Sequence, residues 1–338
     1  MSTGFATERG QSSGSTGSIV ELDNGQKWSI EADTVRAVLA EVFGADVLGE
    51  QLPPPEDHAG LRARFRAEAP QLTALTDEVR RAFSGGACGI LVTRLGLSGL
   101  SVDDQRKAIY ALSVLLGDVV WTHPVDNRVV WDVKAQAPAA DPAESAEPAP
   151  RATRYSSFSE NDQEAEYHTD ASFAVLPDRY FLLYSVQQAD CGGGETFLTD
   201  ARTLTSELEA TPEGREATRL LTEAVLPMRV PKAFRQRAAV GGDGYSYTPM
   251  IEDGVWRFRK DKIEKGLAAH PEYATDEVRR AVDLVYQQLD ARPDEFRAVI
   301  PTDGILIVDN HKALHGRTSF TDSRRHLLRA RFHKAPAE

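Results

Sequence analysis

The chain contains 338 residues, 41% of them hydrophobic and 27% charged, with a formal net charge of −12. A negative field of this size repels phosphate backbones, so we expect no nucleic-acid partner. No apolar run is long enough to cross a membrane, and the polar residues 1–18 lack a signal-peptide pattern, so we expect no membrane partner and a disordered start. Cys88 and Cys191 suit neither a disulfide framework nor a zinc ribbon, which favours a cytoplasmic protein.

The first third of the chain predicts mainly helices. Residues 29–47 and 57–83 carry apolar side chains at three- and four-residue spacing with charged residues between them. Residues 85–95 change to the pattern of a buried strand after two glycines, and 101–120 predict an amphipathic helix with an acidic first turn. Residues 19–134 are therefore expected to form a helix-rich N-terminal part of one catalytic domain.

The rest of the chain predicts a β-rich core. Residues 135–151, rich in Ala, Pro and Glu, predict a flexible loop, either a plain linker or a mobile flap. Short strand-like runs with turn signals then favour a sandwich or jelly roll over residues 152–338, with a helical insertion at 275–291. No glycine-rich nucleotide-binding motif is present. The strand-like runs are residues 179–189, 194–200, 246–260, 304–310 and 325–333.

A His-x-acid motif begins one of these regions. His168 and Asp170 lie two apart, so on a strand both side chains would share one face and Thr169 would point away. The motif alone is weak evidence, because a second copy occurs at His270 and Glu272. A proline follows His270 directly and a helical pattern comes next, so we interpret that copy as a surface histidine near a helix start.

A third ligand is expected from residues 304–320, where a buried strand runs into a loop that carries His311 and His315. Two neutral imidazoles and one carboxylate leave coordination positions open, which is typical of non-haem Fe(II) and oxygen chemistry. Closed structural zinc sites use four protein ligands instead.

Four stretches resemble the Fe(II)/2-oxoglutarate-dependent dioxygenases of the TauD/TfdA, clavaminate-synthase-like family, in the family's order and over about residues 152–333. This resemblance implies a double-stranded β-helix (jelly roll) core with flanking helices, and Fe(II), 2-oxoglutarate and O2 as cofactor and co-substrates. The stretches are "YHTDASF", "ADCGGGETFLTDAR", "DNHKALHGRTSF" and "RRHLLRARF".

The resemblance also implies residue roles. The metal ligands would be His168, Asp170 and His315, and Thr196 and Arg325 would hold the distal carboxylate of 2-oxoglutarate. Further roles would fall on Arg329, in contact with substrate or co-substrate, and on Ser172, Phe173 and Arg331 as a candidate substrate pocket.

The arginines also follow a strand pattern. Arg325, Arg329 and Arg331 would share one face of a strand with Leu327. Burying three guanidinium groups is costly unless anions meet them. The alternative is a solvated edge.

The resemblance implies oxidation of an unactivated C–H bond. Halogenating relatives replace the carboxylate at the position of Asp170 with a small residue, so its presence favours hydroxylation, although desaturation, cyclisation and epoxidation use the same ligands. The expected substrate is a small polar molecule, amino-acid-like or a natural-product intermediate. Acidic residues at Glu164 and Glu166 are candidates to meet a substrate amine.

Three other functions stay open: a non-redox zinc or manganese enzyme on a cupin-like barrel, a binding protein without metal, and a nucleic-acid demethylase. The first would not need Thr196 and Arg325.

We expect Trp121, Trp131 and Trp256 to be core aromatics. Oligomeric state is not predicted.

Overall fold

The computed structural model describes residues 19–22, 30–122, 127–135, 161–174, 176–231, 242–291 and 296–334. The predicted disordered start and almost all of the Ala/Pro-rich loop lie outside these ranges.

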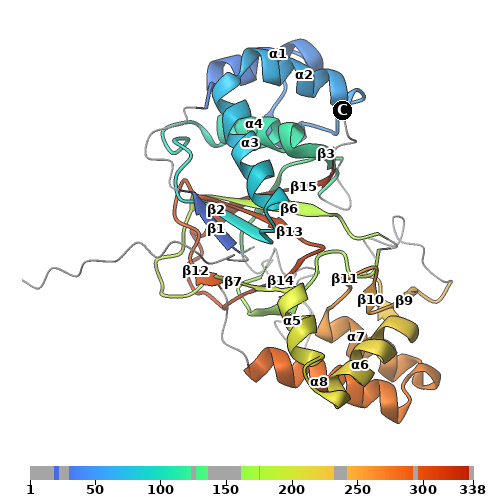
Figure 1. Ribbon diagram of the computed structural model, residues 1–338. Helices are drawn as coiled ribbons and strands as arrows, with labels where there is room; N and C mark the ends of the chain where they lie inside the picture. The colour runs from blue at the N-terminus through green and yellow to red at the C-terminus, as the bar shows by residue number, and fades with distance from the viewer. Residues whose placement is uncertain are drawn as a thin grey trace, which may run out of the picture.

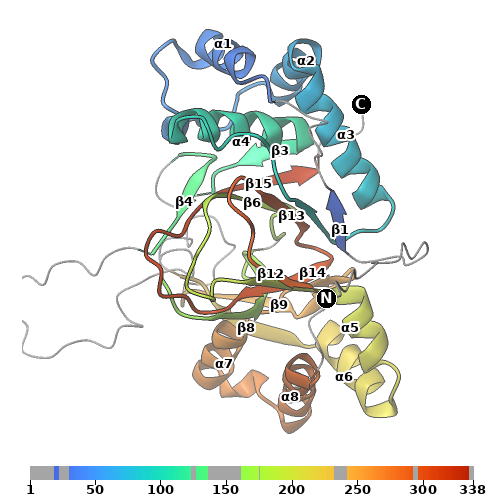
Figure 2. The ribbon, with the colours of Figure 1, turned by 90° about the vertical axis from the view of Figure 1, so that its left-hand side faces the viewer.

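Two sheets form the centre of the molecule, stacked between two layers of helices (Figures 1 and 2). All strand pairs are antiparallel except β1 with β2. In the larger sheet the order is β1 (Ile19–Leu22), β2 (Gly89–Val92), β13 (Ile305–Asp309), β6 (Tyr180–Gln187), β15 (His326–Lys334) and β3 (Gly117–Val120), with β4 (Trp131–Val133) also paired to β15. In the smaller sheet the order is β12 (Phe296–Ala298), β7 (Thr196–Asp200), β14 (Ala313–Arg317) and β5 (Ala165–His168). Two hairpin pairs lie outside these sheets: β8 (Val225–Arg229) with β9 (Tyr245–Pro249), and β10 (Ile251–Glu252) with β11 (Val255–Trp256).

Each sheet is covered on its outer side by helices (Figure 2). The larger sheet carries α1 (Ala32–Phe43), α2 (His58–Glu68), α3 (Pro70–Ser84) and α4 (Val102–Leu116), and the smaller sheet carries α5 (Ala201–Leu208), α6 (Pro212–Glu223), α7 (Lys260–Ala269) and α8 (Asp276–Ala291). Short 3-10 turns occur at Gly49–Gln51 and Pro271–Tyr273. The expected combination of sheets with flanking helices is therefore observed, and no helix in the described part of the chain is long and apolar enough to span a membrane.

Most predicted helices are present, with two differences. The periodic stretch 57–83 is two helices, because Pro70 begins α3 and the residue before a proline disfavours helical backbone. The predicted helix 101–120 ends at Leu116, and its last four residues pair with β15 as β3.

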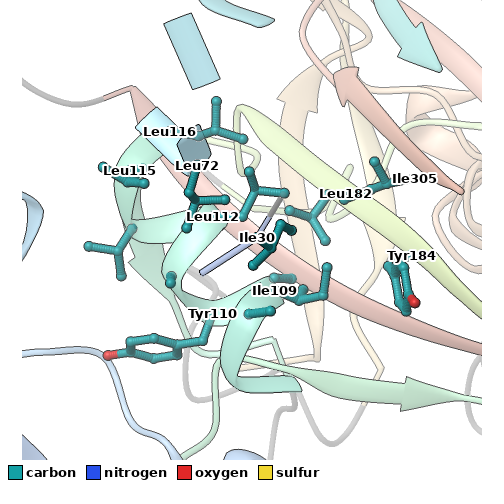
Figure 3. Packing of buried hydrophobic residues seen from close by; sticks show 14 of the residues in the cluster. Ile30, Leu72, Ile109, Tyr110, Leu112, Leu115, Leu116, Leu182, Tyr184 and Ile305 are labelled. Atoms are coloured by element: carbon teal, nitrogen blue, oxygen red, sulfur yellow. The ribbon is translucent and has the colours of Figure 1, made fainter. Parts of the chain in front are cut away.

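The strand β15 shows why both faces of the larger sheet are buried. Leu328 and Phe332 pack into the cluster beneath α1–α4, where the buried side chains of α4 meet Leu182 and Tyr184 (Figure 3). Leu327 points the other way, into a cluster shared with the smaller sheet. Arg329 and Arg331 lie two and four residues after Leu327 in the strand, so their side chains are on the same face as Leu327 and point into the space between the two sheets.

Gly316 in β14 is required by packing. A Cβ at this position would lie 2.1 Å from the ring of Phe197 on β7 and 2.5 Å from the carbonyl oxygen of Ala165 on β5. We expect Gly316→Ala to lower the free energy of unfolding by about 1–3 kcal/mol through overpacking, measured by chemical denaturation. Gly99→Ala is the matched control, because its Cβ would meet nothing within 4 Å; equal stability of the two variants would contradict this account.

Candidate metal centre

His168, Asp170 and His315 come together between the sheets. In the pairing of β5 with β14, His168 lies opposite His315, and their ring centroids are 4.2 Å apart. The Oδ1 atom of Asp170 is 3.8 Å from the Nε2 atom of each histidine. All three side chains are buried, and their ligand atoms lie within 4.8 Å of one another.

The local backbone differs from the prediction in two ways. Strand β5 ends at His168, so Asp170 lies in the turn that follows, where Ala171 has a φ of 52°. His315 was expected in a loop but lies in strand β14. The side chain of Thr169 accepts a hydrogen bond from the backbone N–H of Phe258 at 3.5 Å.

Asn310 fixes the turn that carries Asp170, and the sequence did not single it out. Its Oδ1 accepts a hydrogen bond from the Asp170 N–H at 2.9 Å, and its Nδ2 donates to the carbonyl oxygens of Asp170 at 3.2 Å and Asp178 at 2.8 Å. The side chain is 2% exposed. Asn310 therefore ties the segment after β13 to a turn 140 positions earlier in the chain.

Both imidazoles are held neutral. Burial, and then the nearby positive charges, lower the pKa of His168 well below its usual value. Burial likewise lowers the pKa of His315 to about 3. A hydrogen bond of 2.8 Å between Nδ1 of His168 and the carbonyl oxygen of Glu166 requires Nδ1 to donate, which makes Nε2 the unprotonated nitrogen, the one that can ligate a metal.

The donor set fits a divalent cation. Neutral imidazole and carboxylate are ligands that iron accepts, and three protein donors leave coordination positions for other molecules. Within the described ranges, no other group of three His, Cys, Asp or Glu side chains meets the same distance criterion. His311 instead contacts the carbonyl oxygen of Pro177 through Nε2 at 2.8 Å, so it does not join the cluster.

Arg325 lies immediately before β15 rather than in it, and it is 4% exposed. Its guanidinium lies over the ring of Phe320 at 4.9 Å, and its Nη1 atom has no hydrogen-bond partner among the described residues. Gly194 (φ 78°) packs so closely that a Cβ would be 3.1 Å from the Arg325 Nε atom. Thr196, two residues after this glycine, is buried at the start of β7.

Arg329 and Arg331 lie beside the cluster. Arg329 forms an ion pair with Oδ2 of Asp170, and Nη2 of Arg331 is 3.4 Å from the same atom. Both side chains are buried, and burial lowers the pKa of each guanidinium. The solvated-edge alternative is therefore wrong for these two arginines.

The candidate residues of the substrate pocket do not all line the same pocket. Ser172 is fully buried, whereas Phe173 and Arg331 line a pocket of about 430 Å³ beside the cluster. Glu164 and Glu166 line a different pocket, with Tyr286, Lys260 and other residues of the helical layer at the smaller sheet. Glu164 and Glu166 thus lie in another pocket than Phe173 and Arg331, and their contact with a substrate amine stays a prediction.

Two other residues correct or refine the sequence interpretation. Trp121 is 43% exposed, so it is not a core aromatic, although Trp131 and Trp256 are buried. His270 lies among tyrosines, at 3.4 Å from Glu272, at the junction of α7 with the next turn.

Replacing Asn310 should lower the metal affinity of the site although no ligand side chain is removed. We expect Asn310→Ala to lower metal affinity about 10- to 100-fold, as is usual for residues that orient ligands, because Asp170 loses two hydrogen bonds to its backbone and Asp178 loses one. Calorimetric titration with Mn²⁺ measures this effect. The control is Lys312→Ala in the same segment, and equal metal affinity of the two variants would contradict a positioning role.

Metal affinity should change little with pH in the mildly acidic range. Two histidines of ordinary pKa would cost about tenfold in affinity between about pH 7.5 and 6, since protons compete with the metal. Here both pKa values lie far lower, so we expect a change below about threefold. The same shift predicts that the metal-free protein loses stability as the pH falls below about 6.5, because only the unfolded chain then binds protons.

Two imidazoles and one carboxylate, buried between two sheets with coordination positions open, define a mononuclear metal enzyme of the type used for oxygen chemistry. A family model described as "Taurine catabolism dioxygenase TauD, TfdA family" matches residues 50–331. The chain belongs to this family. The expected enzyme class, an Fe(II)/2-oxoglutarate-dependent dioxygenase, is thereby confirmed.

Solved structures show the same fold. Asparagine oxygenase (AsnO) aligns with a TM-score of 0.61 at 17% identity, covering 95% of this chain and 94% of that one. The non-heme iron oxygenase OrfP, in complex with Fe and alpha-ketoglutaric acid, aligns with a TM-score of 0.59 at 16% identity, covering 93% and 94%. No curated protein matches the sequence significantly. At these identities the likeness concerns the fold.

Proposed function

We propose that this chain uses Fe(II), 2-oxoglutarate and O2 to hydroxylate an unactivated C–H bond of a small polar substrate, amino-acid-like or a natural-product intermediate. The observation that carries the proposal is the buried cluster of two neutral imidazoles and one carboxylate, next to the buried guanidinium groups of Arg329 and Arg331. The structures of asparagine oxygenase with 3-hydroxyasparagine and of OrfP with 3-hydroxyarginine support an amino-acid-like substrate.

His168, Asp170 and His315 would hold the iron. With 2-oxoglutarate and O2, that iron supplies an oxidant strong enough to break a C–H bond, with succinate and CO2 as by-products. The protein positions the target bond and excludes water. The carboxylate of Asp170 occupies the position where a halogenating enzyme would need room for chloride, which supports hydroxylation; desaturation, cyclisation and epoxidation are the alternatives at this site.

Arg325 and Thr196 would bind the distal carboxylate of 2-oxoglutarate. A guanidinium matches a carboxylate through two parallel hydrogen bonds, and Arg325 has a buried nitrogen that no described residue satisfies. Gly194 leaves room for that side chain and precedes Thr196 by two residues. Arg329, beside Asp170, would contact substrate or the keto-acid end of the co-substrate.

The two facing sheets would be the halves of a double-stranded β-helix, with residues 152–338 as the jelly-roll core and residues 19–134 as its helix-rich cover. Neither Cys88, which is buried, nor Cys191, which is exposed, forms a disulfide in the described part of the chain, and this supports a location in the reducing cytoplasm.

The test is turnover of 2-oxoglutarate by the purified full chain with Fe(II) and a reductant, against a panel of amino acids. We expect one class of substrate to raise succinate release and to gain one oxygen atom from labelled O2. A non-redox enzyme with zinc or manganese would instead act without 2-oxoglutarate, so turnover that needs neither 2-oxoglutarate nor O2 would overturn the proposal.

A further inference from the structure

A pocket of about 430 Å³ opens beside the metal cluster, between the end of β3, the turn after β5 and the end of β15. Its inner wall includes Ala171, next to the metal-ligand candidate Asp170, and Arg331, which contacts Asp170. Any molecule that fills this pocket therefore lies next to the cluster. The remaining lining consists of Pro54, Val119, Val120, Trp121, Phe173, Ala174, Leu176, Asp178 and His333.

The guanidinium of Arg331 has donors that the protein leaves poorly satisfied. Its Nη2 atom is 3.4 Å from Asp170 and its Nη1 atom is 3.8 Å from Asp178, and its buried Nε atom has no hydrogen-bond partner among the described residues. Asp170 would also share its negative charge with the iron. A buried guanidinium in this position needs an additional anion.

Asp178 offers the opposite charge on the same wall. Its carboxylate lies 3.6 Å from Nε2 of His333 and 3.8 Å from Arg331, distances at which ion pairs form without good hydrogen bonds. Its backbone is fixed by Asn310, at 2.8 Å from the Asp178 carbonyl oxygen. Asp178 thus has a fixed backbone and a carboxylate with acceptor capacity to spare.

The outer part of the pocket is apolar. Trp121 and Leu176 are 43% and 61% exposed, and they are two of the five large hydrophobic side chains exposed in the described part of the chain. Both line this pocket. Exposed apolar groups in the same pocket as charged ones favour a ligand with an apolar portion.

We propose that this pocket binds a zwitterionic substrate, with its anionic group on Arg331, its ammonium group on Asp178 and an apolar portion against Trp121 and Leu176. Arg331 and Asp178 are then specificity residues, in addition to the candidates given above for iron and 2-oxoglutarate. This inference rests on the proposed function. The charge preference of the pocket can nevertheless be measured by binding alone, without turnover.

The test is calorimetric titration of the full chain, loaded with Fe(II) and 2-oxoglutarate without oxygen. Three probes of matched shape are used: L-phenylalanine with both charges, 3-phenylpropanoate with the acid alone, and phenethylamine with the amine alone. We expect L-phenylalanine to bind at least about tenfold more tightly than either of the others, because only it satisfies both residues.

Two variants separate the two subsites. Arg331→Met should weaken L-phenylalanine and 3-phenylpropanoate at least about tenfold and leave phenethylamine unchanged. Asp178→Asn should weaken L-phenylalanine and phenethylamine and spare 3-phenylpropanoate. Because Arg331 is buried and its variant could misfold, the partly exposed Asp178 provides the second, independent test.

The proposal is overturned if L-phenylalanine fails to bind at millimolar concentration, if the three probes bind alike, or if Asp178→Asn affects all three equally. Failure of the proposed function would look different. In that case 2-oxoglutarate would not be consumed with any substrate, while the discrimination among the three probes would persist.

Discussion

His315→Ala should reduce iron-dependent turnover of 2-oxoglutarate by at least about 100-fold, because two protein ligands hold iron far less tightly than three. His315 suits this test because its Nδ1 atom has no hydrogen-bond partner in the described ranges, so the substitution breaks no hydrogen bond there. Its ring packs against Phe181 at 4.5 Å, and the resulting cavity should cost some stability without unfolding the chain. Bound iron after gel filtration and succinate formation are the two measurements.

His311→Ala is the matched control. It lies four residues earlier and contacts the carbonyl oxygen of Pro177 instead of the cluster. We expect it to retain its iron and most of its turnover. Loss of iron from the His311 variant, with retention in the His315 variant, would mean that the wrong histidine has been assigned.

Arg325→Ala should raise the KM for 2-oxoglutarate about 100-fold, with a much smaller effect on kcat at saturating co-substrate. Removing one partner of a buried, hydrogen-bonded charge pair costs about 3 kcal/mol, which corresponds to about two powers of ten in affinity. Arg325→Lys should recover only part of the loss, because an ammonium keeps the charge but not the two parallel hydrogen bonds. Steady-state kinetics with varied 2-oxoglutarate separate the two constants.

The neighbouring Arg324 provides the control for this experiment. Its side chain is 67% exposed and pairs with Asp190 and Asp322 on the surface. We expect Arg324→Ala to leave the KM for 2-oxoglutarate within about twofold, since surface ion pairs contribute little. An unchanged KM in Arg325→Ala would remove Arg325 from the co-substrate site.

Periodicity in the sequence predicted many of the elements that frame the site. The apolar runs that became β6 and β13, and the amphipathic patterns of α4 and α8, are strong because each element buries a regular set of side chains. Strand β14 stands where the sequence predicts a loop, and its residues, "ALHGR", include a glycine and polar side chains. Its strand conformation depends on pairing with β5 and β7, and Gly316 is there because the ring of Phe197 occupies the space of a Cβ.

The sequence pattern did not predict helices α5, α6 and α7, and two of them, α6 and α7, contain a glycine. Gly214 and Gly266 interrupt the helical pattern, yet each lies against backbone, at a hypothetical Cβ distance of 1.7 Å from the carbonyl oxygens of Leu208 and Pro227 respectively. Close packing of this kind favours glycine inside a helix, and no local pattern announces it.

Some parts of the candidate site could be predicted from the sequence and others could not. The ligand set His168, Asp170 and His315 could be predicted although His315 is far away in sequence, because each ligand lies in a short stretch, "YHTDASF" or "DNHKALHGRTSF", that resembles the family. The support from Asn310 and the pairing of Arg331 with Asp178 could not, because each joins segments that are more than 100 positions apart and is created by the fold.

The central claim is that one buried site binds Fe(II) and 2-oxoglutarate together. Anaerobic titration of the metal-free protein with both, followed by visible absorption, tests it most directly. We expect a weak charge-transfer band near about 500 nm, as an open iron site gives when it chelates a keto acid, in the parent chain and its loss in His315→Ala. Absence of the band in the parent chain with fresh reductant, or its persistence in the variant, would contradict the account.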